Sequence, residues 1–279
     1  MALPFLKWAG GKRRLLPQLE PLLPSDLEDR EYCEPFVGGG AVFFSLANRL
    51  KGTPLLGDMN PRLMQTYRDV RDRLPQVLHN LRPLVAQVSA EDFYRIRNRF
   101  NVGLGSSAQL TAMFIYLNKL CFNGLYRVNR KGDFNVPYGR YKRPRILDVP
   151  TIRAASAALQ PVMLVGCPRG SDFARTTQFL SKRAFIYVDP PYDPVSTSAN
   201  FTSYTHRGFD EATQARLARC LHNWSLSGHK VMISQSDTPL IRELYEGFDI
   251  TTISAPRSVA ADGSKRQAVG ELVIRNYDV

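Results

Sequence analysis

Ala184-Phe185-Ile186-Tyr187-Val188-Asp189-Pro190-Pro191-Tyr192 is an apolar run that stops at a carboxylate, two prolines and an aromatic ring. Its first five residues predict a buried strand, because they are apolar, β-rich and bounded by turn residues. Each proline restricts its own φ and holds the preceding residue extended, so the last four residues should form a rigid turn. Such a turn lies at the carboxyl end of a strand, where open α/β sheets bind their ligands.

The turn suits chemistry on a planar base that carries an exocyclic amine. The lone pair of such an amine is delocalised into the ring, which makes the nitrogen a poor nucleophile. The Asp189 carboxylate and the carbonyl between the prolines can accept the two amino N–H bonds and draw the nitrogen towards tetrahedral geometry. Tyr192 offers a ring on which the base can stack. Alternatively, Asp and Pro simply begin a loop, and the turn alone does not separate the two interpretations.

A second motif, Glu34-Pro35-Phe36-Val37-Gly38-Gly39-Gly40, precedes the helix-like run Ala41–Leu46. Glycines between a strand and a helix let the backbone approach a ligand and leave helix N–H groups free to face it. The pattern lacks the full dinucleotide fingerprint and the Walker lysine, which disfavours hydride and phosphoryl transfer.

The next short strand, 54–57, ends at Asp58, and an acid about 20 residues after such glycines typically binds ribose hydroxyls. The alternative is that Asp58 caps a helix that begins at Pro61.

Together with Phe5-Leu6-Lys7-Trp8-Ala9-Gly10-Gly11-Lys12, these motifs resemble those of the class I S-adenosylmethionine-dependent DNA adenine-N6 methyltransferases. Their order is similar to that of the alpha group, or D12 class. Residues 118–142 and Asn200-Phe201-Thr202-Ser203-Tyr204 resemble the Dam methyltransferases, which modify adenine in GATC. The resemblance covers nearly the whole chain. It implies a monomeric enzyme that needs S-adenosyl-L-methionine but no metal, and that flips an adenine out of duplex DNA for direct methylation.

The resemblance also assigns residues. Asp189, Pro190, Pro191 and Tyr192 are the implied catalytic residues, with Asp189 near both the transferred methyl and the target amine. Without the resemblance, Trp8 reads as a core aromatic and Lys12 as a surface charge. The implied cofactor-binding residues are Trp8, Gly10, Lys12, Glu34, Phe36, Gly38, Gly40, Asp58 and Asp189.

The segment 119–143 interleaves basic and aromatic residues. Lys131-Gly132 lies between two alternating segments and predicts a β-hairpin, and a two-stranded ribbon fits the major groove of DNA. The alternative is a solvated surface hairpin whose aromatic residues serve ordinary packing.

By resemblance, Arg127 reads a guanine, Leu125 and Pro137 contact a thymine methyl, and Phe122 and Asn123 enter the base stack. Phe122 replaces a tyrosine of the family, which should preserve stacking but remove any hydroxyl contact. Lys7 matches a residue that contacts the first guanine, and the residues implied near phosphates are Asn129, Asn135, Arg140, Tyr141 and Lys142.

The net charge agrees with a polyanionic partner. The 37 Lys and Arg residues outnumber the 25 Asp and Glu residues, which gives a formal charge of +12. Such a balance favours DNA, because the release of counterions adds affinity that does not depend on sequence. Membrane attachment is the weaker alternative, since Met1–Lys7 lacks the order of a signal peptide and no apolar run is long enough to span a bilayer. We therefore expect a cytoplasmic protein.

The cysteines argue against a zinc site and against a disulfide framework. Cys33, Cys121, Cys167 and Cys220 are far apart and form no Cys-x-x-Cys pair. Cys167-Pro168 reverses the Pro-Cys order found where a thiolate attacks cytosine C5. An exocyclic amine needs no such thiolate, so we expect Cys167 to be structural.

Strand-like segments at Val162–Val165, Ala184–Val188, Lys230–Ser234 and Leu272–Ile274 alternate with helix-like ones. This alternation predicts a doubly wound α/β sheet, and the resemblance makes it a Rossmann-like class I methyltransferase sheet.

Helix-like segments at 61–99 and 109–120 interrupt the strand pattern. We therefore predict a catalytic domain from 1–58 and 146–279 and an inserted, mainly helical target-recognition domain at 59–145, which carries the hairpin. The Ser- and Thr-rich segment Val195–Gly208 is typical of a loop that orders over substrate. Methylation of cytosine N4 or of RNA, and a noncatalytic DNA-binding role for the same fold, remain alternatives.

Overall fold

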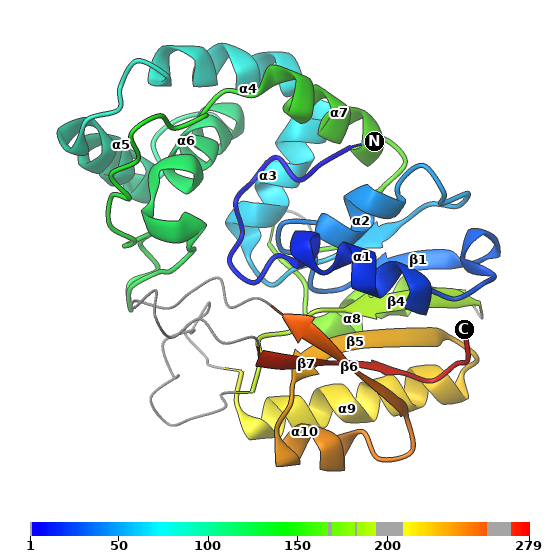
Figure 1. Cartoon of the computed structure of the whole chain (residues 1–279). Coiled ribbons are helices and arrows are strands. Elements are labelled where there is room, and N and C mark those ends of the chain that lie inside the picture. The colour runs from blue at the N-terminus through cyan, green and yellow to red at the C-terminus, as the bar shows by residue number, and fades with distance from the viewer. Residues whose placement is uncertain (1, 167–168, 182, 194–208, 256–268) are drawn as a thin grey trace.

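The computed structural model describes residues 2–166, 169–181, 183–193, 209–255 and 269–279. Within them, seven strands form one sheet in the order β3-β2-β1-β4-β5-β7-β6 (Figure 1). The first five strands in this order pair in parallel, and β7 runs antiparallel to both β5 and β6. The expected mixed α/β fold is therefore confirmed. The strands are β1 (Glu31–Glu34), β2 (Leu55–Leu56), β3 (Met163–Leu164), β4 (Ala184–Val188), β5 (Lys230–Ser236), β6 (Asp249–Ala255) and β7 (Val269–Arg275).

Alternation along the strands produces two separate apolar faces. In β4, Phe185 and Tyr187 join one core cluster, whereas Ala184, Ile186 and Val188 join the other. This is the period of two expected of a strand that is covered on both sides.

The helices cover these two faces unequally. One face packs on α9 and α10, and the other supports α1 and α2 and shares its core with the layer formed by α3 to α7 (Figure 1). The α-helices are α1 (Leu16–Leu19), α2 (Ala41–Leu46), α3 (Pro61–Asp72), α4 (Leu74–Leu81), α5 (Ala90–Val102), α6 (Ser107–Leu120), α7 (Val149–Leu159), α8 (Phe173–Thr176), α9 (Glu211–Leu226) and α10 (Pro239–Leu244). The 3₁₀-helices are η1 (Lys12–Arg14), η2 (Glu20–Leu22), η3 (Leu27–Asp29), η4 (Arg82–Leu84), η5 (Phe122–Gly124) and η6 (Thr177–Phe179).

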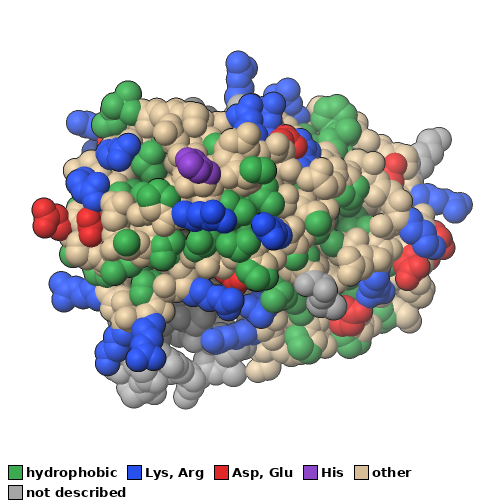
Figure 2. All heavy atoms as spheres, turned by 90° about the horizontal axis from the view of Figure 1, so that it is seen from above, with side chains coloured by type: hydrophobic (Ala, Val, Ile, Leu, Met, Phe, Trp, Pro, Cys, Tyr) green, Lys and Arg blue, Asp and Glu red, His purple; other side chains and the backbone are tan. Residues whose placement is uncertain are grey.

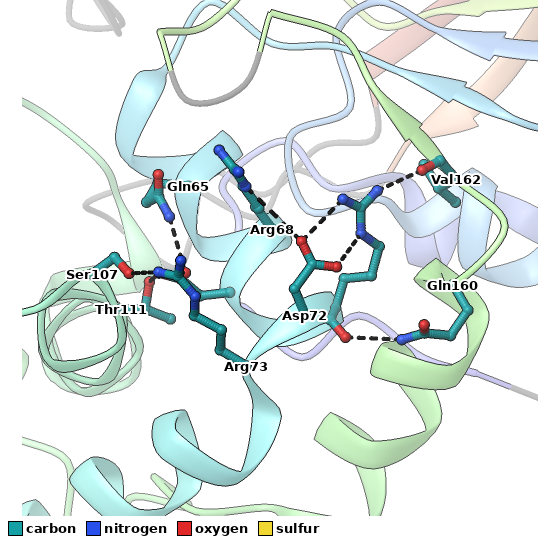
Figure 3. Close-up of polar contacts among 10 residues, drawn as sticks. Gln65, Arg68, Asp72, Arg73, Ser107, Thr111, Gln160 and Val162 are labelled. Carbon is teal, nitrogen blue, oxygen red and sulfur yellow. Dashed lines mark hydrogen bonds and ion pairs between the residues drawn. The ribbon is translucent and has the colours of Figure 1, made fainter.

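Polar contacts made by α3 connect this helical layer internally and to the sheet (Figure 3). Asp69 is buried on α3 and accepts hydrogen bonds from Thr111 Oγ1 at 2.8 Å and Gln65 Nε2 at 3.0 Å. Nearby, Arg71 Nη1 donates to the carbonyl of Val162, just before β3, at 2.7 Å. Because a buried carboxylate needs such partners, α3 is held in one orientation between α6 and the edge of the sheet.

Two structural details differ from the sequence predictions. The strand β6 was not predicted, since polar residues interrupt its apolar positions. Within the described ranges it lies at the sheet edge and pairs with β7 alone. The expected ribbon around Lys131-Gly132 does not form regular strands. It is a loop with a turn at Gly132 and two isolated antiparallel bridges, Val128 with Phe134 and Cys121 with Tyr138.

Candidate active site

The two principal motifs meet at one edge of the sheet. Glu34 ends β1 and leads into the glycine loop, and Asp189 directly follows the last residue of β4. These strands are parallel neighbours, with Cys33 opposite Ile186. Their carboxyl ends therefore lie side by side, which is where a sheet of this kind binds ligands.

Asp58 is tied to the glycine loop. Its Oδ2 accepts a hydrogen bond from the Gly38 N–H at 3.0 Å, and its Oδ1 accepts one from the Asn60 N–H at 2.8 Å. Asn60, not Asp58, caps α3, because its side chain accepts from the N–H groups of Arg62 and Leu63. The alternative interpretation of Asp58 as the helix cap is therefore wrong. Burial raises the pKa of Asp58 to about 6, although its two backbone hydrogen bonds favour the ionised form.

Trp8 lies directly on the glycine loop. A Cβ added to Gly38 would come within 2.9 Å of Trp8 Cδ1, and one added to Gly39 would come within 2.9 Å of Trp8 Cβ. The indole also stacks on Tyr126, with ring centroids 6.0 Å apart and planes inclined by 16°. The amino-terminal motif thus bridges the glycine loop and the segment after α6.

We expect Gly38→Ala to lower the free energy of unfolding by at least about 1–2 kcal/mol. Gly38 has a φ of +47°, a conformation unfavourable for alanine, and the new methyl group would displace Trp8. Urea unfolding measures the effect. Gly52→Ala is the matched control, since no atom lies within 4 Å of a Cβ at Gly52, and equal losses for the two variants would contradict the prediction.

Glu34 points away from the loop and into the core. Its Oε2 accepts hydrogen bonds from the Tyr32 hydroxyl at 2.8 Å and from the Phe43 N–H in the first turn of α2 at 3.1 Å. Gly40 precedes α2 and provides no side-chain cap, so Glu34 satisfies this helix end from the adjacent strand. Burial, and to a lesser degree the charge of Asp189, raises the pKa of Glu34 to about 8, while the two hydrogen bonds favour its ionised form.

Glu34→Gln should raise the stability of the protein at alkaline pH. Because the pKa of Glu34 rises from 4.5 to about 8 on folding, the folded state holds a proton that the unfolded state releases in this range. The wild type then loses stability between pH 4.5 and 8, by up to about 1 kcal/mol per pH unit. The glutamine keeps both acceptor contacts but cannot ionise.

Urea unfolding of both proteins from pH 4 to pH 9 tests this prediction. The advantage of the glutamine variant should grow across this interval and level off above about pH 8. A constant difference between the two proteins would count against it.

Asp189 belongs to a compact charged cluster. Lys12 Nζ lies 2.6 Å from Asp189 Oδ1 and donates to the Gly10 carbonyl at 3.1 Å. Lys12 is only 4% exposed, so it is not the surface charge that its sequence alone suggested. Burial raises the pKa of Asp189 to about 6, against the opposing effect of Lys12. The cluster also contains Tyr192 and Glu271, and the sequence analysis had missed Glu271.

A chain of buried amides holds the backbone after the prolines. Gln214 Nε2 on α9 donates to the Pro191 carbonyl at 3.1 Å, and Gln235 Nε2 on β5 donates to Gln214 Oε1 at 3.0 Å. Gln235 Oε1 also accepts from the Asp193 N–H, and Ser236 Oγ donates to the Asp193 carbonyl. The sequence signal for Gln235 was weak, because Gln235 lies in the polar end, Ser234-Gln235-Ser236, of a strand whose apolar part is Val231–Ile233.

The remaining cofactor candidates line the same loop. Phe36 stacks on Phe173 with ring centroids 5.5 Å apart and meets the edge of Phe209. Gly40 has a φ of +69° and leaves room for the Tyr67 hydroxyl, which donates to the Gly38 carbonyl. The candidates Trp8, Phe36, Gly38, Gly40 and Asp58 thus lie in or against the glycine loop. Gly10, Lys12 and Asp189 belong to the charged cluster, and Glu34 is directed inward.

Asn101 of α5 holds the loop after α6 through both backbone groups of Phe134. Asn101 Nδ2 donates to the Phe134 carbonyl at 3.0 Å, and Asn101 Oδ1 accepts from the Phe134 N–H at 2.9 Å. At the tip, Asn129 Oδ1 accepts from the N–H groups of Lys131 and Asp133, so Asn129 builds the turn. Arg127 is exposed, and its Nε donates to Asn135 Oδ1 at 2.8 Å.

Lys7 is held against the same region by Asn118. The Lys7 N–H donates to Asn118 Oδ1 at 2.8 Å, and Asn118 Nδ2 donates to the Lys7 carbonyl at 2.6 Å. Lys7 Nζ donates to the Lys119 carbonyl and lies 3.8 Å from the centre of the Tyr141 ring. Desolvation lowers the pKa of Lys7, and the Tyr141 hydroxyl donates to the Cys121 carbonyl.

The other nucleic-acid candidates lie mostly at the surface. Leu125 packs against the core, whereas Asn123 and Arg140 have positive φ values of 53° and 51°. Figure 2, which views the helical layer from above, shows Lys and Arg side chains distributed over that face with fewer Asp and Glu. The exposed candidates are Phe122, Asn123, Arg127, Pro137, Arg140 and Lys142.

Several predictions fall outside the described residues, namely the Val195–Gly208 loop, the Asn200–Tyr204 motif and Cys167. Among the residues that are described, Cys33 and Cys121 are buried. In the same part of the chain, no group of three or more His, Cys, Asp or Glu side chains is placed to hold a metal ion. No helix within the described ranges is long and apolar enough to cross a membrane.

The chain is similar to known proteins over nearly its whole length. A sequence model of the D12 class N6 adenine-specific DNA methyltransferases matches residues 8–259. The chain is 40% identical to the Type II methyltransferase M.MjaIII of Methanocaldococcus jannaschii, over 98% of this chain and 99% of that protein. It is 38% identical to a DNA adenine methylase of Vibrio cholerae, over 96% and 94% of the two chains, and 35% identical to one of Salmonella typhi, over 96% and 93%.

Proposed function

Because the chain belongs to the D12 class of N6 adenine-specific DNA methyltransferases, we propose that it methylates adenine N6 in duplex DNA within GATC. One observation supports this most strongly. The Asp189 turn and the Asp58-bound glycine loop adjoin at the carboxyl ends of β4 and β1. A base amine at the first motif and a cofactor at the second would then lie next to each other, as direct transfer requires.

The residues around the glycine loop fit S-adenosylmethionine. Gly38 and Gly39 leave space that a Cβ would fill, and Trp8 covers them. Asp58 faces the loop with a carboxylate suited to ribose hydroxyls. When bound, S-adenosylmethionine supplies a methyl group on a positively charged sulfur. The proposed binding residues are Trp8, Gly10, Lys12, Phe36, Gly38, Gly40, Asp58 and Asp189, with Glu34 supporting the loop through α2.

The Asp189 turn activates the amine. Asp189 and the Pro190 carbonyl accept the two N6–H bonds, which directs the nitrogen lone pair at the methyl group. In the transfer the N–C bond would form as the S–C bond breaks, leaving the demethylated cofactor, and the extra proton on N6 would leave through the Asp189 carboxylate to solvent. Tyr192 provides the ring on which the adenine stacks. Since N6 is paired inside the duplex, the adenine must first flip out of the stack, at a cost of a few kcal/mol.

We assign DNA reading to the insert at 59–145 together with Lys7. Arg127 reads a guanine, Leu125 and Pro137 contact a thymine methyl, and Phe122 and Asn123 fill the stack. Phosphate contacts are assigned to Asn129, Asn135, Arg140, Tyr141 and Lys142. The exposure of Arg127, Arg140 and Lys142, and the anchoring of the loop by Asn101, support this division of roles.

The test uses the purified chain, labelled S-adenosylmethionine and duplex DNA with or without GATC. We expect label in N6-methyladenine, identified by mass analysis of the nucleosides, and only in DNA that contains GATC. Label in N4-methylcytosine, or in RNA alone, would select the corresponding alternative. Cofactor binding without turnover would indicate a noncatalytic DNA-binding protein. Sequencing of methylated sites after expression in an unmethylated host would identify the recognition sequence.

A further inference from the structure

Glu271 lies on the face of the sheet that supports the active-site cluster. It is in β7, opposite Ser236 of β5 and Ile253 of β6, and is only 6% exposed. Glu271 and Val273 are two residues apart in β7, so their side chains lie on the same face of the sheet. Val273 packs in the core cluster that contains Tyr187 of β4. A carboxylate buried this deeply requires polar partners.

Glu271 has two such partners. The Tyr192 hydroxyl donates to Glu271 Oε1, and Lys12 Nζ lies 3.7 Å from the same oxygen. Lys12 Nζ is also 2.6 Å from Asp189 Oδ1 and 4.6 Å from the centre of the Tyr192 ring. Four side chains from three separate segments therefore form one cluster, with Lys12 between two carboxylates.

This arrangement places Lys12 on one of the two oxygens of the carboxylate that the proposed reaction uses. The target amine has to approach the Asp189 carboxylate, and Lys12 occupies Oδ1 of that group. Lys12 is 4% exposed, so bulk water cannot replace Asp189 as the partner of its ammonium group. Moving a buried ammonium away from its carboxylate is strongly unfavourable unless another anion replaces it.

We propose that Glu271 is a positioning residue that receives the Lys12 ammonium when the target amine binds Asp189, and that holds the Tyr192 ring through its hydroxyl. This inference rests on the proposed function. A movement of about 1 Å would bring Lys12 Nζ from 3.7 Å to the usual distance of a charged hydrogen bond with Glu271. The cluster would keep its net charge throughout, and Asp189 would become available to the amine.

The pH dependence of catalysis offers a readout that a purely structural role would not change. Among the residues that the structure describes, the titratable groups that interact with Asp189 are Lys12 on η1, Glu34 on β1, Tyr187 on β4, Tyr192 after β4 and Glu271 on β7. The charge of Glu271 raises the pKa of Asp189, and that of Lys12 lowers it. The acid limb of the pH profile is the range in which kcat/KM falls as Asp189 becomes protonated. Glu271→Gln should therefore move the acid limb to lower pH, and Lys12→Met should move it to higher pH.

The experiment compares Glu271→Gln and Glu271→Asp with the wild type on methylatable DNA at saturating cofactor. The glutamine keeps an acceptor for Tyr192 but removes the charge, so kcat should fall about 10²-fold with a smaller change in KM. The aspartate keeps the charge and should retain the wild-type acid limb. Glu246→Gln is the control, because Glu246 is exposed beyond α10, and it should leave kcat and the pH profile unchanged.

A double-mutant cycle tests whether Glu271 acts through Lys12. In the Lys12→Met background, Glu271→Gln should cause little further loss, because there is no ammonium left to receive. Additive losses, a wild-type kcat for Glu271→Gln, or one shared acid limb for the Gln and Asp variants would each overturn the proposal. A wild type that transfers no methyl to adenine would instead refute the proposed function, and this inference with it.

Discussion

Asp189→Asn should lower the rate of methyl transfer by about 10²–10³-fold while DNA binding persists. The asparagine has the same shape and one acceptor oxygen, but it lacks the negative charge that stabilises the amino group as its nitrogen becomes positive. Lys12 would also lose the carboxylate that lies 2.6 Å from its Nζ. Single-turnover transfer of labelled methyl groups measures the chemical step, and a gel-shift assay on the same DNA measures binding.

The pH dependence of the wild type follows from the same carboxylate. Burial raises the pKa of Asp189 to about 6. Only the ionised carboxylate has both oxygens free of a proton and can accept the N–H of the amine. The kcat/KM of the wild type should therefore fall about tenfold per pH unit below pH 6 and level off above it. The Asp189→Asn variant should show no such fall of kcat/KM below pH 6. A variant with wild-type rate and profile would exclude Asp189 as the acceptor of the amine.

Arg127→Ala should relax sequence discrimination more than it weakens binding. A bidentate contact between an arginine and a guanine contributes about 1–3 kcal/mol of discrimination, or roughly 5-fold to 150-fold. Arg127 is exposed, and its Nε donates to Asn135 Oδ1 at 2.8 Å, which fixes one side of the guanidinium group. The loss of discrimination is measured by the ratio of kcat/KM for GATC to kcat/KM for sites changed at one base. This ratio should fall only for sites in which one particular guanine is replaced.

Lys142→Ala provides the comparison for this variant. Lys142 is exposed and assigned to phosphate contact, so its loss should weaken binding to all sequences alike. The salt dependence of binding should fall by the amount expected for about one phosphate contact. If Arg127→Ala lowered activity on every site equally, Arg127 would contact phosphate and would not read a base.

Local sequence patterns predicted the secondary structure correctly wherever a segment carries its own physical signal. The run 184–188 forms β4 because every residue in it is apolar and buried, and α2 spans Ala41–Leu46 as its composition predicted. Pro61 begins α3 as expected, but the structure assigns the cap to Asn60 and frees Asp58 for the glycine loop. Both residues favour caps, so sequence could not choose between them.

The amino-acid sequence by itself determined the apolar strands, the helix starts and the order of the motifs, since these depend on periodicity and turn chemistry within a few residues. The tertiary structure alone decided which side chains contact one another across separate segments. Lys12 is buried between Asp189 and Glu271, and Gln214 holds the Pro191 carbonyl, because the sheet order brings distant segments together. Ion pairs and buried hydrogen bonds depend on this spatial neighbourhood, which no local pattern specifies.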